Sequence, residues 1–171
     1  LQLCDKLISI TADGLVDTPD LLLSGLTSTA WYKISGGEKG LHLVLGKVYV
    51  KYIKGTNPVL NEDKLVEVVI PSGVTVILAE AFADITKLGK VTISATVETI
   101  EEKAFNNLTT LKEVVFADGS ELKTIGKSAF SKTSNLTSIL LPEGLITIKD
   151  NAFDASNLKT ISIPDSVKTI G

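Results

Sequence analysis

The side chains that could carry out chemistry are few and do not converge. His42 is the only histidine, and the apolar residues Leu41 and Leu43 on either side of it predict a strand. A metal site needs several Cys, His or carboxylate ligands at close spacing, and His42 has no cysteine near it. A serine nucleophile needs a histidine that a carboxylate orients, and neither this arrangement nor a Gly-x-Ser-x-Gly motif occurs. We therefore expect no catalytic residue, no metal site and no cofactor, and a protein that is not an enzyme.

Other patterns in the sequence favour structural roles over chemistry. The glycine-rich segment 35–40 lacks the spacing of a phosphate-binding loop, so it predicts a hairpin turn. The adjacent acids Glu62-Asp63 and Glu101-Glu102 are typical of solvated faces, whereas glycosidases need two carboxylates across a cleft. Asn107-Leu108-Thr109 and Asn135-Leu136-Thr137 match glycosylation acceptors, but such triplets are common and Leu136 also fits a core position.

The composition excludes several classes of protein. The chain has 171 residues, of which 44% are hydrophobic, and its net charge is −3, so it is too apolar for a disordered chain. No apolar run reaches the roughly 18 residues that a transmembrane helix needs. All 17 basic residues are lysines, so no arginine fork can bind phosphate or guanine, and nucleic acid is not an expected partner. The single cysteine, Cys4, cannot form an internal disulfide.

The two ends of the chain suggest processing. The sequence has no Met and no charged-then-apolar leader, so we expect a processed product or a piece of a longer chain. Residues 1–4 resemble a bacterial lipidation site at Cys4. The residue before such a cysteine is usually small, and Leu3 is not, so lipid anchoring is the less favoured interpretation. Gly171 falls inside a repeat, and we expect the natural chain to continue or to end in a disordered tail.

A pattern of seven apolar positions repeats along the chain from residue 65. Four full copies and a partial fifth begin at residues 65, 88, 111, 136 and 158, so the spacings are 23, 23, 25 and 22 residues. The third copy contains a two-residue insertion within segment 117–120. The positions of the first copy are Leu65, Val68, Ile70, Val74, Ile77, Ala81 and Phe82. This regularity indicates a repeat architecture.

Each repeat predicts two short strands joined by a turn. Val68 and Ile70 are two residues apart, so both side chains point to one face of a strand. Segment 71–73, Pro-Ser-Gly, then indicates a turn, because proline removes a hydrogen-bond donor from the strand ladder. Residues 74–77 form a second extended piece, and the Ala-Phe pair follows in a helix-compatible stretch such as 101–105. One such unit cannot bury its apolar side chains, whereas stacked units can.

The repeat resembles the BspA-like class of leucine-rich repeats, whose unit reads roughly Leu-x-x-Ile-x-Ile-Pro-x-x-Val-x-x-Ile-Gly-x-x-Ala-Phe-x-x-Cys-x-x. Segment 158–171 matches this unit at every defined position that it covers, and the resemblance extends over residues 65–171. The family's cysteine position holds Ile85, Leu108, Thr133 and Ser156, so no cysteine ladder is expected. The polar Thr133 and Ser156 predict looser packing in the third and fourth repeats.

This resemblance implies a fold and a class of function. The implied fold is an α/β leucine-rich-repeat solenoid with parallel strands stacked every ~23 residues, short helical or irregular segments on the other face, and an atypical N-terminal cap. The implied function is that of a secreted or cell-surface protein of host-associated bacteria, with adhesion or protein binding as its role. The partner would be a protein of the host extracellular matrix or cell surface. A structural spacer or stalk that displays another module is the alternative, because a fold does not determine a function.

Residues 1–64 do not follow the repeat cleanly. Segment 18–20, Thr-Pro-Asp, predicts the start of a helix. Strands are expected over residues 31–34, 41–45 and 48–53. We interpret 1–64 as an N-terminal cap, with decayed repeats as one origin, because the end of a solenoid exposes an apolar cross-section. An independent small α/β module is the alternative, with its junction near segment 56–58.

Strand alternation predicts a surface for a partner. In each repeat the residues on either side of the inward Val or Ile face outward, and stacking places them in two columns with about 4.8 Å between neighbouring coils. The candidate residues are Glu67, Val69, Lys90, Thr92, Glu113, Val115, Ser138, Leu140, Thr160 and Ser162. The more apolar column is the candidate partner-binding surface, although β-propensity or contact with a flanking strand also explains it. The charged column favours strand register through cross-strand pairing.

Overall fold

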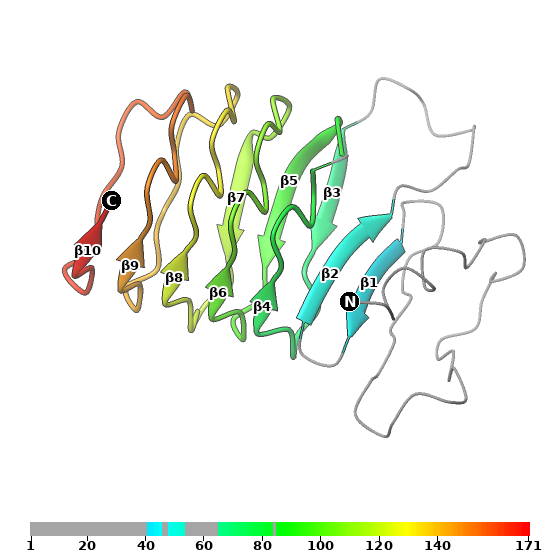
Figure 1. The fold of residues 1–171 in the computed structure, drawn as a ribbon, viewed down its shortest axis with the longest axis horizontal. Coiled ribbons are helices and arrows are strands. Elements are labelled where there is room, and N and C mark those ends of the chain that lie inside the picture. The colour runs from blue at the N-terminus through cyan, green and yellow to red at the C-terminus, as the bar shows by residue number, and fades with distance from the viewer. Residues whose placement is uncertain (1–40, 46–47, 54–64, 84) are drawn as a thin grey trace, which may run out of the picture.

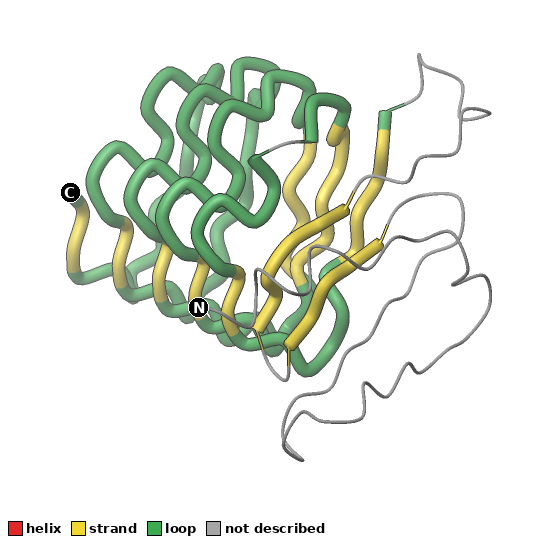
Figure 2. Tube along the Cα trace, turned by 45° about the vertical axis from the view of Figure 1, so that its right-hand side comes forward, coloured by secondary structure: helices red, strands yellow, loops and turns green. Residues whose placement is uncertain are grey.

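The computed structural model describes residues 41–45, 48–53, 65–83 and 85–171. From residue 65 onward the chain winds into a solenoid of about 5 coils, which lie side by side along the horizontal axis of Figure 1. Two ladders of short strands run along these coils, and turns connect them (Figure 2). The parallel-stranded solenoid that the repeat predicts is therefore confirmed.

The first sheet consists of three parallel strands, β3 (Val66–Val69), β5 (Leu88–Ile93) and β7 (Glu113–Phe116). Its register places Val68 opposite Val91 and Val91 opposite Val114, and all three side chains are buried. Farther along, Leu140 and Ser162 form an isolated parallel bridge. Equivalent positions of successive repeats are thus neighbours in space, as the spacing predicts.

The second sheet carries one two-residue strand from each coil. These strands are β4 (Val76–Ile77), β6 (Thr99–Ile100), β8 (Thr124–Ile125), β9 (Thr147–Ile148) and β10 (Thr169–Ile170). All of them pair in parallel, and the isoleucine of each strand lies opposite the isoleucine of the next. The second extended piece that the repeat predicts is therefore present in every coil.

A hairpin extends the second sheet toward the N-terminus. β1 (Leu41–Leu45) pairs antiparallel with β2 (Val48–Ile53), and β2 pairs in parallel with β4. The strands expected over 41–45 and 48–53 are therefore confirmed. The helix start expected at 18–20 and the strand expected over 31–34 lie outside the described residues. Whether residues 1–64 form a cap or an independent module stays a prediction.

The third side of each coil is built from turns, and the described residues contain no helix. Lys103 and Asn107, which flank the pair Ala104-Phe105, have φ angles of 55° and 60°, so this segment cannot follow a right-handed helix. Their amides donate to the carbonyls of Lys127 and Ser131 in the next coil, both at 2.9 Å. The helical alternative for this side is therefore wrong in the described coils, because hydrogen bonds between coils replace those within a helix.

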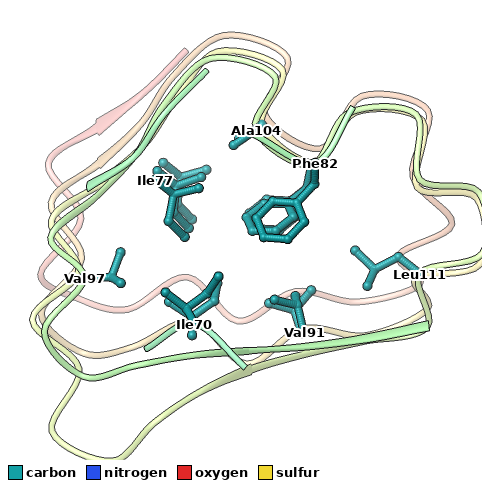
Figure 3. Close-up of a cluster of buried hydrophobic side chains, with 14 of the residues drawn as sticks. Ile70, Ile77, Phe82, Val91, Val97, Ala104 and Leu111 are labelled. Atoms are coloured by element: carbon teal, nitrogen blue, oxygen red, sulfur yellow. The ribbon is translucent and has the colours of Figure 1, made fainter. Parts of the chain in front are cut away.

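The core is a set of columns in which like residues lie on one another. Figure 3 shows Ile70 and Val91 on one wall of the interior and Ile77 on the opposite wall. Phenylalanine rings form a further column along the third side, with the order Phe82, Phe105, Phe130 and Phe153 and with ring centroids 4.7, 5.1 and 5.6 Å apart. Stacked rings of this kind contribute about 0.5–1.5 kcal/mol per pair beyond their burial.

The polar residues at the family's cysteine position are accommodated. Thr133 is buried, and its hydroxyl donates to the carbonyl of Phe130 at 2.8 Å. Ser156 is half-buried. A buried hydroxyl with a partner avoids the desolvation cost of an unpaired one, so the fold retains its column packing at Thr133 despite the loss of an apolar side chain.

Column packing predicts that Phe105→Ala lowers the free energy of unfolding by about 3–5 kcal/mol. Phe105 is fully buried and stacks on a ring on each side. Urea denaturation followed by circular dichroism measures the change. Phe153→Ala is the matched control and should cost less, because Phe153 is only partly buried. A loss below about 1 kcal/mol for Phe105→Ala would contradict this account of the core.

Candidate partner-binding face

The open face is the outward side of the first sheet and its continuation, made of the ten candidate residues named above. The register aligns Glu67, Lys90 and Glu113 in one column and Val69, Thr92 and Val115 in the other. All ten side chains are exposed or half-buried, whereas the valines between them on β3, β5 and β7 are buried. The structure therefore brings these residues to one surface, and their role in binding stays a prediction.

The two columns are not continuous along the solenoid. Leu140 and Ser162 pair only with each other, in a bridge separate from the three-stranded sheet. At the end of β7 the amide of Ala117 donates a hydrogen bond to the carbonyl of Ile93 in the preceding coil, at 2.9 Å. Pro142 occupies the equivalent position one coil later, and it has no amide hydrogen to donate. The inserted residues that include Gly119, with a φ of 72°, also fall between these coils. The unbroken columns expected from the repeat are thus divided into two parts.

One ion pair lies on the open face. The ammonium group of Lys90 donates to Glu113 Oε1 at 2.9 Å. This hydrogen bond raises the pKa of Lys90 above the ordinary lysine value of 10.5, and the charges of Glu113 and Glu67 add to the increase. Both side chains of the pair are substantially exposed, at 36% and 53%, so water and salt screen the interaction. Its main effect is to hold Lys90 over the sheet between two carboxylates.

Two large apolar side chains of the open face project into solvent. Val69 is 63% exposed and Leu140 is 81% exposed, the highest exposed fraction of any large hydrophobic residue in the described part of the chain. Val115, in the same column, is half-buried. Leu140 lies outside a regular strand, so β-propensity does not explain it, and it is the most exposed apolar side chain of this face.

Charges beside the open face are segregated by sign. The entry rim, where each coil enters the face, consists of residues 86–87, 109–112, 134–137 and 156–159, and its only charges are Lys87, Lys112 and Lys159. The exit rim, where each coil leaves the face, consists of residues 71–73, 94–96, 117–121, 142–144 and 164–166, and its only charges are Asp118, Glu121, Glu143 and Asp165. All of these side chains are exposed except Lys87, which is half-buried. Sequence reasoning missed the two rims, although aligning the repeats beyond their apolar positions would have found them.

The adjacent acids Glu101-Glu102 differ from the solvated pair that the sequence predicts. Glu101 is half-buried, and its Oε2 accepts a hydrogen bond from the amide of Ala79 in the preceding coil at 3.0 Å. Glu102 is exposed and lies 3.5 Å from the ammonium group of Lys103. Glu101 therefore holds two coils together, and only Glu102 fits the expectation.

The structure describes only some of the remaining candidate side chains. His42 lies on β1 and its side chain, like Cys4, is outside what the structure describes. Asn107 and Asn135 are exposed, and Leu136 is buried, as its core position predicts. In the described ranges no three His, Cys, Asp or Glu side chains are grouped to hold a metal ion. No helix in those ranges is long and apolar enough to cross a membrane.

Comparison with protein families identifies a repeat model that covers most of this chain. The model is that of the BspA type leucine rich repeat region, and it matches residues 57–171 with 6 copies. The match begins before Leu65, where the repeat pattern of the sequence starts. No curated protein matches the chain.

Several solved structures share the fold. A leucine-rich repeat protein from Bacteroides ovatus is 28% identical, with a TM-score of 0.61 over 86% of this chain and 37% of that one. The pneumococcal vaccine antigen PcpA is 27% identical, with a TM-score of 0.55 over 80% of this chain and 39% of that one. A leucine-rich repeat protein from Bacteroides capillosus, 20% identical with a TM-score of 0.58 over 81% of this chain and 99% of that one, supports the fold alone. The chain thus spans under two-fifths of the first two proteins.

The ion pair of the open face predicts that Glu113→Gln lowers the pKa of Lys90 toward 10.5, because the hydrogen bond to a carboxylate is its largest cause. Heteronuclear NMR of the lysine side chains across a titration measures this pKa. Glu67→Gln is the matched control and should lower it less, since Glu67 acts only through its charge. An equal or larger effect of Glu67→Gln would show that Lys90 pairs with the other carboxylate.

Proposed function

The chain belongs to the BspA-type leucine-rich repeat family, and from this membership we propose that it is a surface-located, non-enzymatic protein that binds another protein through its open face. The observation that carries the proposal is the exposure of Val69 and Leu140 on the open face, at 63% and 81%. Exposed apolar side chains framed by charged residues are typical of surfaces that bind proteins.

The chemistry of the open face supports a protein partner over a small molecule. Its candidate residues extend over successive coils, so a ligand must be long enough to span several of them. Val69 and Leu140 offer apolar contacts, while the Lys90–Glu113 pair offers both a donor and an acceptor. An adhesion role, with a host extracellular-matrix or cell-surface protein as partner, follows from this combination and from the family.

The proposed absence of catalysis rests on the kinds of residue that the repeats contain. The repeats, residues 65–171, have neither histidine nor cysteine, and general acid–base or nucleophilic chemistry would have to rely on their carboxylates and lysines. On the open face of the described coils, Lys90 and Glu113 are engaged with each other in an exposed ion pair, and the rims add lysines on one side and carboxylates on the other, so no buried acid–base pair is formed there.

The surface location rests on the family and on its similarity to known proteins. PcpA, 27% identical over 80% of this chain, is named as a pneumococcal vaccine antigen, and a vaccine antigen is normally accessible from outside the cell. Secretion or display on the cell surface is therefore part of the proposal for this chain. Lipid anchoring through Cys4 stays the less favoured alternative.

A structural spacer is the second candidate function. The two more similar solved proteins are longer, and this chain matches only 37% and 39% of their lengths. A solenoid of this kind therefore occurs as one part of larger chains. In this alternative the repeats position another module, and the open face has no partner of its own.

The proposal predicts that the triple variant Val69→Asp, Val115→Asp and Leu140→Asp loses binding to a matrix protein that the unmodified chain binds. Three buried carboxylates in the interface would be costly, and the expected loss of affinity is at least about 30-fold. Biolayer interferometry against immobilised fibronectin, laminin and collagen measures it, with circular dichroism to verify the fold.

The matched control changes two outward residues of the second sheet and the residue that precedes β9, Thr124→Asp, Thr169→Asp and Ile146→Asp, and should retain binding. Unchanged binding by the folded open-face variant would place the site on another surface. Failure of the unmodified chain to bind any of the proteins would favour the spacer.

A further inference from the structure

Opposite charges line the two sides of the open face. Because the strands are parallel, every coil enters the face on one side and leaves it on the other. In the described coils all charges of the entry rim are lysines, although segment 134–137 has none, and all charges of the exit rim are carboxylates, which begin at Asp118. The face has an electric polarity across its width, in the direction of the strands, rather than along its length.

The most exposed apolar side chain lies near charges of both rims. Leu140 is 81% exposed. Glu143 lies on the exit rim of its own coil, and Lys112 and Lys159 lie on the entry rim of the two neighbouring coils, all of them exposed. A complementary partner must offer an apolar group for Leu140, with carboxylates on one side of it and cations on the other.

This chain itself has that combination, and we propose that the open face binds the open face of a second copy. The two copies are related by a two-fold axis that lies in the interface and runs along the solenoid. Such an axis reverses the direction of the strands in the partner, so the entry rim of each copy faces the exit rim of the other. The inference rests on the proposed function, that this face binds protein, and names the partner.

The same symmetry brings the apolar residues together. A two-fold axis that runs along the solenoid and passes over the column of Val69 and Leu140 leaves each coil at its own height, so Leu140 meets the equivalent residue of the partner, and Val69 does the same. These contacts would form an apolar centre between two charged margins, which is the usual arrangement of a protein interface. The two solenoids then run in the same direction, which suits two copies on one cell surface.

Charge also selects against the other two-fold arrangement. An axis parallel to the strands would keep the strand direction of the partner, and it would place lysines opposite lysines and carboxylates opposite carboxylates. Like charges across an interface disfavour association. The polarity of the rims therefore specifies one mode of pairing, which makes the proposal sharper than the presence of an apolar patch alone.

The first experiment is sedimentation velocity of the whole chain over a range of protein concentrations. We expect a monomer–dimer equilibrium that weakens as salt is added, because the rim contacts are exposed and screened. Leu140→Asp should raise the dissociation constant at least about 30-fold. Ile146→Asp is the matched control and should leave it unchanged, because Ile146 is a 37% exposed apolar residue that precedes β9, away from the open face. A chain that remains monomeric at about 1 mM overturns the proposal, as does a dimer that Leu140→Asp leaves intact.

The second experiment exchanges the charges of the rims. One variant carries Lys112→Glu and Lys159→Glu, so both of its rims are predominantly acidic. The other carries Asp118→Lys, Glu143→Lys and Asp165→Lys, so both of its rims are predominantly basic. Each variant alone should be monomeric, and an equimolar mixture should form heterodimers. Self-association of either variant at the unmodified affinity overturns the proposed pairing, as does a mixture that fails to associate.

These results separate the inference from the proposed function. If the unmodified chain is monomeric but the open-face triple variant no longer binds a matrix protein, the proposed function stands and the proposed pairing with a second copy is wrong. If the chain dimerises through Leu140 and binds none of the matrix proteins, the proposed pairing with a second copy is supported and the adhesion role is wrong.

Discussion

In-register stacking of equivalent residues is the constraint on which the rest of this structure depends. The cross-section of each coil is apolar, so a coil is stable only when the next coil covers it. The parallel register that pairs Ile77 with Ile100, and continues in the same way to Ile170, aligns the apolar columns. A slip by one residue would turn these side chains away from the core. The phenylalanine stack satisfies the same constraint on the third side.

Stacking also decides where the backbone hydrogen bonds go. On the third side, amides donate to the next coil, and residues such as Lys103 and Asn107 adopt positive φ angles to allow it. That backbone conformation is costly for residues other than glycine, and the intercoil bonds offset the cost. Side chains take part as well, since Glu101 accepts from Ala79 of the preceding coil, and Thr133 donates to Phe130 within its own coil. Polar residues in these places therefore support the solenoid.

The open face is a consequence of the same alternation. Inward positions of the first sheet are committed to the core, so the outward positions and the two rims are the part of each coil that is free to vary. Variation is visible there: the outward column reads valine, threonine, valine, leucine and serine, and an insertion follows β7. A family with one fold can therefore present many surfaces, and binding must be argued from each chain's own residues.

The spacing of apolar residues determined, from the sequence alone, the solenoid, its two ladders of strands and the residues that face outward. Few other folds can bury a periodic apolar pattern, and the burial of core positions such as Leu136 follows from that pattern. Only the tertiary structure decided that the third side forms turns, because the partners of those amides lie in the next coil. It also decided the role of Glu101 and the break beyond β7, where Pro142 lacks an amide hydrogen for the preceding coil. These features depend on contacts between coils, which the pattern within one repeat does not contain.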